Sequence, residues 1–431
     1  MRLEAEMGKA TKLTRAVWCM CFAVIMALTG CSSRADAEPS AAEISKISSA
    51  AGFLAAKVEE SEGFIASAGE KEKMPYYAYL YDNAVALIAL SDAGADWHAQ
   101  KIADAIVFAQ AHDRAFDDGR LRNTYVSGDP KSDSGRSITA RKITIRLPGF
   151  WQDGRWQEDF YTVSTSTGNM AWTILALCAA TKNAPADKRE EYLEAATRAA
   201  DFILTLKSSD GGFTAGYEGW DDDQVKVTYK STEHNIALIC AFTALADAVA
   251  EHNPGKSAGY REASEYAKAF VFSTYDKKLH CFYTGTEDDG KTISEGVIPL
   301  DTNTLTILAL ADELEDVYSI LSFVENRMSV GDGFDFSAGD LDGIWNEGTA
   351  QMAACYSLLG DAEKYDKIML YLKTQAGKDG GIPAADRDGV STGFVVVGSD
   401  ILWEYNNSES IAATSWYAFA QMNGSPFQTI V

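Results

Sequence analysis

A segment with polar residues at its head and apolar residues behind them recurs six times, and this repeat restricts the fold more than any other feature. Each copy continues as a run of small and apolar residues, the composition of a helix buried on most sides. The copies begin at Tyr81-Asp82-Asn83, Ser166-Thr167-Gly168-Asn169, Ser231-Thr232-Glu233-His234-Asn235, Asp301-Thr302-Asn303, Trp345-Asn346-Glu347 and Asn407-Ser408-Glu409. Such recurrence indicates repeats of one supersecondary unit.

More amphipathic segments alternate with the apolar ones and indicate an outer layer of helices. They span about residues 42–60, 97–112, 187–207, 258–274, 315–328 and 361–376. A charged or glycine turn follows each: Glu62-Gly63-Phe64, Asp118-Gly119-Arg120-Leu121, Asp210-Gly211-Gly212-Phe213, Asp276-Lys277-Lys278-Leu279, Asp332-Gly333-Phe334 and Asp379-Gly380-Gly381-Ile382. Twelve alternating helices predict an all-α fold, an (α/α)6 toroid of six inner and six outer helices.

The connections of this toroid are asymmetric. Links from an inner to an outer helix are short, whereas links from an outer to an inner helix are long, the longest being 113–167. We therefore expect the long loops on one rim, beside the N-termini of all inner helices, with a β-hairpin that turns at Asp153-Gly154. Loops on a rigid scaffold commonly carry function. Residues 42–431 are predicted to form this single domain.

The N-terminus has the pattern of a targeting segment. Lys9, Lys12 and Arg15 precede the apolar run 17–28, which ends in Leu28-Thr29-Gly30-Cys31. This ending resembles a bacterial lipobox, whose cysteine is lipidated and becomes the mature N-terminus. We expect residues 1–31 to be a lipoprotein signal peptide, 32–41 a linker, and the protein to be anchored through Cys31 on the extracytoplasmic side of the bacterial envelope. The alternative is a chance cysteine beside an ordinary signal peptide.

Charge and cysteine content narrow the range of ligands. The net charge of −24 argues against nucleic acid as a partner and suits a neutral polymer or small ligand. Cys178, Cys240, Cys281 and Cys355 are spaced as buried free thiols rather than as a disulfide framework. The sequence has no CxxC or HExxH pattern and only five histidines, so we expect neither a metal nor another cofactor.

Several sequence segments in the repeats resemble those of the six-hairpin glycosidase superfamily, and the resemblance covers about residues 42–424. They are TSTGNMAW, WNEGTAQMAACYSLLGD and KDGGIPAADRDG, together with the glycine turns. The resemblance implies an (α/α)6 toroid and a carbohydrate ligand. It does not select one activity, because the superfamily is similar in fold to polysaccharide lyases, sugar epimerases and terpenoid cyclases. A DxDD motif, as in squalene-cyclase-type toroids, does not occur in the sequence.

Carboxylates, amides and aromatic residues gather at the predicted rim, a combination that suits a sugar site. We expect Glu347, Glu233, Asp82 and Asp301 to supply the catalytic carboxyl groups, with Glu409 as a further rim carboxylate. Glycoside hydrolysis needs two such groups, one of them protonated. The predicted substrate contacts are Asn83, Asn169, His234, Asn235, Asn346, Trp151, Trp220, Trp345 and Trp403.

A purely structural interpretation competes with this one. Asp and Asn are favoured helix N-caps, so helix starts would carry them without any catalysis. Glu is a poor N-cap, which gives Glu233 and Glu347 more functional weight. We expect Glu347, directly after Trp345-Asn346, to be the general acid with a raised pKa, and Asp82 or Asp301, as capped and ionised groups, to be the base.

Three classes of function stay open. The first, which we favour, is a lipid-anchored glycoside hydrolase acting on oligo- or polysaccharide. The second is a polysaccharide lyase or sugar epimerase, which needs a base such as His234 or a tyrosine before Asp82, and an amide such as Asn235 to neutralise a carboxylate. The third is a non-catalytic glycan-binding lipoprotein, which would need the aromatic residues but no paired acid and base.

Overall fold

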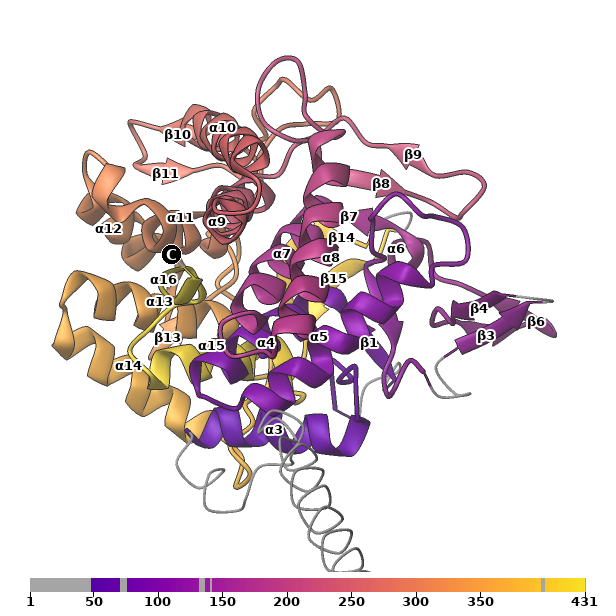
Figure 1. Ribbon diagram of the computed structural model, residues 1–431. Helices are drawn as coiled ribbons and strands as arrows, with labels where there is room; N and C mark the ends of the chain where they lie inside the picture. The colour runs from indigo at the N-terminus through magenta and orange to yellow at the C-terminus, as the bar shows by residue number, and fades with distance from the viewer. Residues whose placement is uncertain (1–47, 70–75, 132–135, 140–141, 397–399, 431) are drawn as a thin grey trace, which may run out of the picture.

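The computed structural model describes residues 48–69, 76–131, 136–139, 142–396 and 400–430, and its helices form two concentric layers (Figure 1). The inner helices are α4 (Leu80–Asp92), α7 (Thr167–Ala180), α9 (Thr232–Val249), α11 (Leu300–Leu310), α13 (Asn346–Leu359) and α15 (Ile411–Gln421). The outer helices are α3 (Ser49–Ser61), α5 (Asp96–Ala111), α8 (Ala186–Leu204), α10 (Pro254–Ser273), α12 (Val317–Met328) and α14 (Ala362–Gln375).

The inner helices close into a ring. Each packs against the next in chain order, and α15 packs against α4 to complete the circle. Each outer helix lies against inner helices, as α5 does on α4 and α7. The predicted all-α (α/α)6 toroid is therefore confirmed. The first outer helix begins at Ser49, later than the residue 42 expected from the sequence; residues 1–47, with Cys31, the signal peptide and the linker, lie outside the described residues.

The composition of the two layers explains their positions. Thirteen of the fourteen residues of α7 are buried, which its alanines and other small residues allow. In α8, by contrast, the buried residues recur on one face, at Tyr192, Ala195, Ala196, Ala199 and Ala200. The buried apolar side chains form one continuous core, and the four cysteines within the described residues are buried free thiols, as expected.

The two repeated motifs of the sequence meet in space. In every repeat a backbone N–H in or just after the turn donates a hydrogen bond to a side chain in the first turn of the following inner helix. The pairs are Ile65 to Asn83, Leu121 to Met170, Phe213 to Asn235, Phe282 to Asn303, Phe334 to Thr349 and Ile382 to Thr414. These bonds satisfy buried turn donors and fix each long loop against its helix.

The long loops form small antiparallel sheets. They are β1–β2 (Tyr77–Tyr79, Thr124–Val126), β3–β4 (Arg136–Thr139, Lys142–Ile145), β5–β6 (Phe150–Gln152, Arg155–Gln157), β7–β8–β9 (Thr165–Ser166, Gly216–Glu218, Val225–Lys226), β10–β11 (Tyr275–Asp276, Cys281–Phe282), β12–β13 (Ser329–Val330, Gly333–Phe334) and β14–β15 (Val390–Val395, Leu402–Tyr405). The predicted turn Asp153-Gly154 joins β5 to β6, with positive φ at both residues.

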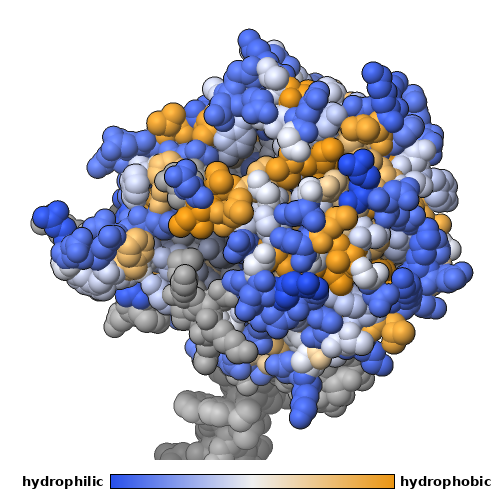
Figure 2. Space-filling view, turned by 180° about the vertical axis from the view of Figure 1, so that it is seen from behind, coloured by the Kyte–Doolittle hydropathy of each residue, from blue (hydrophilic) through white to orange (hydrophobic). Residues whose placement is uncertain are grey.

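The chain ends in a short helix, α16 (Pro426–Ile430), that lies over the middle of the ring (Figure 1). It follows the C-terminal end of α15 and packs against α4 and α7. Figure 2 shows the molecule from behind, where hydrophobic residues lie in groups among hydrophilic ones. None of the helices in the described part of the chain is both long and apolar enough to span a bilayer.

Candidate active site

Glu347 lies in the first turn of α13 and is buried, with 7 % of its surface exposed. The Tyr81 hydroxyl donates a hydrogen bond to Glu347 Oε1 at 2.6 Å. That hydroxyl accepts in turn from Trp416 Nε1 at 2.9 Å, so its own hydrogen is left for Glu347. Burial raises the pKa of Glu347 to about 8; the Tyr81 bond lowers it, and the charges of nearby Asp82, Asp301 and Glu233 raise it further.

Glu233 occupies the first turn of α9 and is held by a second indole. Trp172 Nε1 donates to Glu233 Oε1 at 3.1 Å, and the other oxygen, Oε2, lies 3.5 Å from His234 Nε2. Burial raises the pKa of Glu233 to about 7, although the Trp172 bond opposes this rise. The carboxyl keeps partial contact with solvent, since 22 % of the side chain is exposed. One oxygen of each glutamate is therefore fixed by an N–H or O–H donor.

Asp82 and Asp301 complete the group of carboxyls. Each sits in the first turn of its helix, but the N-cap residues are Tyr79 for α4 and Pro299 for α11. The expectation that the two aspartates cap their helices is therefore wrong. Burial raises the pKa of each aspartate to about 7. At Asp82 a hydrogen bond with Ser67 opposes this rise, whereas at Asp301 the charge of Glu233 adds to it.

His234 is a neutral imidazole at the edge of this group. Burial lowers its pKa to about 4. Its Nε2 lies 3.4 Å from Ser166 Oγ, while Nδ1 is buried with no hydrogen-bond partner among the described residues. The ring fits closely over α7, because a Cβ at Gly168 would meet His234 Cδ2 at 2.4 Å.

Tyrosines that the sequence analysis did not assign surround the carboxyls. Burial and the charge of Asp82 raise the pKa of Tyr161 to about 12. The pKa of Tyr405 lies well above its usual range, through burial and through the charges of Glu347, Asp301 and Asp82. Trp403 packs edge to face on Tyr161, with ring centroids 5.5 Å apart, which places this predicted contact near the carboxyl group.

Trp345, another predicted contact, lies against Tyr405. It is 2 % exposed and stacks on Tyr405 with ring centroids 5.6 Å apart. Gly348 leaves room for the indole, since a Cβ there would meet Trp345 Cε3 at 2.3 Å. Trp345 therefore supports Tyr405 and has almost no surface for a ligand.

Three of the predicted amide contacts are structural instead. Asn83 and Asn235 are fully buried, and their amide groups bond the turn backbone at Ile65 and Phe213. Asn346 is equally buried, donating to the Pro383 carbonyl and accepting from the Tyr371 hydroxyl. Because their polar atoms are used and covered, none of the three can bind substrate in this structure. Asn169 is partly exposed and donates to Asn123 Oδ1 at 2.9 Å.

Two predicted tryptophans make their recorded contacts with residues other than the four carboxyls. Trp151 is 71 % exposed on the β5–β6 hairpin and packs edge to face on Trp156. It lines a hollow of about 510 Å³ together with Arg114 and Glu158. Trp220 donates from Nε1 to the Glu158 carbonyl oxygen and packs on Phe160. No interaction found among the described residues joins either indole to the four carboxyls.

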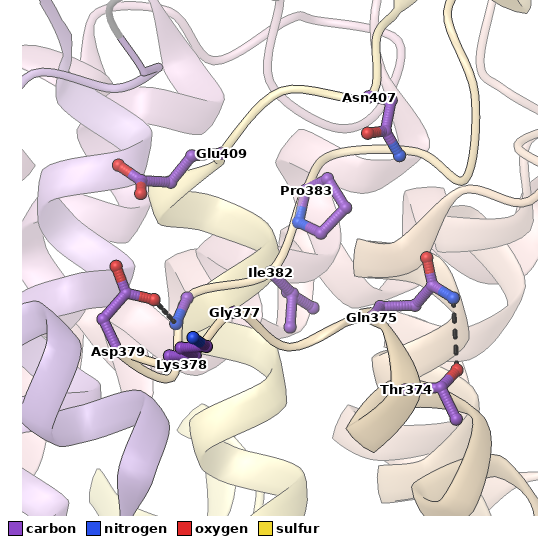
Figure 3. A pocket seen from close by; sticks show the side chains of 10 residues that line it. Thr374, Gln375, Gly377, Lys378, Asp379, Ile382, Pro383, Asn407 and Glu409 are labelled. Carbon is purple, nitrogen blue, oxygen red and sulfur yellow. Dashed lines mark hydrogen bonds between the residues drawn. The ribbon is translucent and has the colours of Figure 1, made fainter.

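Glu409 also separates from the group. Its carboxylate pairs with Lys57 of α3 at 3.3 Å. It lines a groove of about 670 Å³ between the end of α14 and the segment before α15, with Gln375, Asp379 and Asn407 (Figure 3). Glu409 precedes the first residue of α15, whereas Glu347 lies within α13. This offset by part of a helical turn directs the side chain outward.

A second acidic cluster is the only group in the described residues whose spacing suits a metal ion. The carboxylate oxygens of Asp335, Asp340 and Asp342 lie within 4.8 Å of one another. Burial and the charges of the other two raise the pKa of Asp335 to about 7. The backbone N–H groups of Phe336 and Asp342 already donate to the Asp335 carboxylate. The cluster belongs to the loop between β13 and α13 and was not anticipated from the sequence.

Comparison with known proteins places the fold. The chain matches no family model, and a search of curated proteins also gives no match. Among solved structures it is similar to a glycosidase variant in complex with glucose, at 12 % identity and a TM-score of 0.60 over 91 % of this chain and 100 % of that one.

Two further solved structures are similar to the same extent. A D-mannose isomerase matches at 11 % identity and a TM-score of 0.59, over 90 % of this chain and 99 % of that one. A cellobiose 2-epimerase from Bacillus thermoamylovorans matches at 11 % identity and a TM-score of 0.56, over 86 % and 95 % of the two chains. At these identities the likeness shows a shared six-hairpin toroid.

Proposed function

We propose that the protein is a glycoside hydrolase for neutral oligo- or polysaccharides, with Glu347 as general acid and Asp82 as its carboxylate partner. The observation that carries this proposal is the buried Glu347 carboxyl, fixed by Tyr81 beside three other carboxyls. Glycoside hydrolysis requires two carboxyl groups at one bond, one protonated and one ionised.

Two hydrogen bonds support a position for the acidic proton of Glu347. Trp416 supplies a hydrogen to the Tyr81 hydroxyl, and Tyr81 supplies its own hydrogen to Glu347 Oε1. Oε1 is therefore an acceptor, and the proton of the neutral acid sits on Oε2, which is free to donate to a glycosidic oxygen. A pKa of about 8 keeps this proton in place at neutral pH.

Asp82 is the partner that the structure favours among the remaining carboxyls. It follows Tyr81 directly in α4, and of the neighbouring charges it acts most strongly on Glu347. Burial raises the pKa of both carboxyls, and the charge of an ionised Asp82 raises the pKa of Glu347 further, which favours a state in which Asp82 is ionised and Glu347 is protonated. In that state Asp82 can activate a water molecule or attack the sugar directly.

The surroundings suit a neutral sugar. Tyr161, Trp403 and Tyr405 place aromatic rings beside the carboxyls, and such rings stack on the apolar faces of sugars. Four neighbouring carboxyls repel an anionic substrate whenever they are ionised. A bound glucose in one similar structure, named above, agrees with a carbohydrate ligand.

A sugar isomerase or epimerase is the second candidate, and His234 is the observation that favours it. The imidazole is neutral at physiological pH and lies beside Glu233, so it can accept a proton from a sugar carbon. Two of the similar structures are a D-mannose isomerase and a cellobiose 2-epimerase. In that case His234 rather than Glu347 would be indispensable.

One panel of assays separates these candidates. The purified protein is incubated with neutral α- and β-linked oligosaccharides, followed by measurement of new reducing ends, and with free sugars in D2O, followed by NMR. Hydrolysis that is lost in Glu347→Gln and Asp82→Asn, but kept in the exposed control Glu262→Gln, supports the proposal. Deuterium incorporation that depends on His234 would replace it with the second candidate. Binding without turnover would indicate a glycan-binding protein.

We also propose that the enzyme is lipid-anchored through Cys31 on the extracytoplasmic side of a bacterial membrane. This proposal rests on the sequence before residue 32, where an apolar run leads into Leu28-Thr29-Gly30-Cys31. A surface-held hydrolase would act on glycans that reach the cell from outside.

A further inference from the structure

The C-terminal helix α16 places one aromatic ring inside the toroid. Phe427 is 4 % exposed and stacks on Trp172, with ring centroids 5.3 Å apart and an angle of 22° between the planes. Because α16 packs on α4 and α7 after the chain has left the end of α15, this ring reaches Trp172 from the side opposite the long loops.

Trp172 connects this ring to both glutamates. Its indole nitrogen donates to Glu233 Oε1. Its ring also meets Tyr81 edge to face, with centroids 5.5 Å apart, and Tyr81 donates to Glu347. Trp416, which donates to Tyr81, is a second edge-to-face neighbour of Trp172, with ring centroids 6.2 Å apart. A displacement of Trp172 therefore reaches the donors of both carboxyls at once.

We propose that Phe427 is a positioning residue, and that α16 acts as a stop that holds Trp172 in place so that Glu233 and Glu347 keep their orientation. This inference rests on the proposed function, since it assigns the tail a role in the same carboxyl site. No hydrogen bond or ring contact found among the described residues joins Phe427 to a carboxyl, so we expect its effect to pass through Trp172.

Packing explains why the stop matters. The residues four positions before and after Trp172 on the same face of α7 are Gly168 and Ala176, which are too small to hold the indole in place. Removing the Phe427 ring leaves a cavity against one face of the indole, which surrounding side chains fill only in part. The indole then gains freedom to tilt, and its hydrogen bond to Glu233 weakens. Small displacements of catalytic groups lower turnover strongly.

The experiment compares Phe427→Ala with Phe323→Ala, a similarly buried phenylalanine in outer helix α12 that is 8 % exposed. Both variants lose stability. Only Phe427→Ala is expected to lose on the order of tenfold in kcat and to shift its pH–rate profile, with KM less affected. Phe427→Tyr, which keeps the ring, should restore most of kcat and the parental profile.

Two further variants keep the inference testable if Phe427→Ala does not fold. Phe427→Leu keeps apolar volume without a flat ring and should fall between alanine and the parent. Trp172→Phe keeps the stack but removes the donor to Glu233, so it should alter the pH profile in the same direction as Phe427→Ala. Parental kcat and pH profile in the Phe427 variants would overturn the inference, whereas full activity of Glu347→Gln would overturn the proposed function itself.

Discussion

Tyr81 and Glu347 are 266 residues apart in the chain, yet the tyrosine hydroxyl lies 2.6 Å from the carboxylate. Their helices, α4 and α13, are not adjacent in the ring, since α15 lies between them and supplies Trp416 to the same chain of hydrogen bonds. Three inner helices thus meet at one carboxyl. This bond fixes one oxygen of Glu347 and leaves the other for chemistry.

Removing the Tyr81 hydroxyl should change the acidity of Glu347. Because the Tyr81 bond lowers the pKa of Glu347 against the larger effect of burial, Tyr81→Phe is expected to raise that pKa further. The alkaline limb of the pH–rate profile should move to higher pH, and kcat should fall on the order of tenfold. An alkaline limb that stays in place or moves to lower pH would show that Glu347 does not govern it.

The same carboxyl should weaken the folded state at high pH. The pKa of Glu347 rises from 4.5 in the unfolded chain to about 8 in the folded protein. The folded state keeps its full stability below pH 4.5, where the carboxyl is protonated in both states. It loses stability as the pH rises from there through 8, because the unfolded chain ionises at lower pH. Glu347→Gln should therefore raise the free energy of unfolding by about 1–3 kcal/mol at pH 8, with almost no gain at pH 4.5. Urea unfolding at both values checks this, with Glu262→Gln as control; equal effects at both values would contradict a raised pKa.

The amides that bind the turns should matter for stability rather than for substrate. Asn235→Ala leaves the Phe213 N–H buried without its partner and should cost about 1–3 kcal/mol of unfolding free energy. The exposed Asn183→Ala serves as the matched control in urea unfolding. If the Asn235→Ala protein is instead as stable as the parent and has a greatly raised KM, Asn235 binds substrate.

The anchor can be tested in cells. Cys31→Ala removes the proposed acylation site, so the protein should leave the membrane fraction while its toroid stays folded. Stable anchoring takes more than one acyl chain, as a lipobox cysteine carries. Continued fractionation with membranes after this change would show that the lipobox interpretation is wrong.

The sequence predicted the fold because its signals are periodic. Apolar helices, amphipathic helices and turns recur in order, and each repeat reports the same unit. The structure adds the reason for the recurrence of polar helix heads, since side chains such as Asn83 and Thr414 hold the preceding turns. A polar residue at a helix start therefore either holds the preceding turn or supplies a carboxyl to the site, and the sequence alone does not distinguish these two roles.

The angular position of a residue around the helix axis decides which of the two roles it has. Successive residues point about 100° apart, so Asp82 joins the carboxyls while its neighbour Asn83 faces a turn. Glu409, before its helix begins, pairs with Lys57 instead. The roles of Trp172 and Trp416 were hidden for a similar reason. Both are fully buried, and the direction of an indole N–H cannot be inferred from sequence.

The central claim is that Glu347 donates the proton to the leaving group, and leaving-group dependence tests it most directly. Glu347→Gln should lose about three orders of magnitude in kcat/KM on an oligosaccharide, whose alkoxide leaving group needs protonation. On a dinitrophenyl glycoside of the same sugar, whose leaving group departs unprotonated, the loss should be tenfold or less, on the order of 1 kcal/mol. Equal losses on both substrates, or none on either, would contradict the assignment of Glu347 as the general acid.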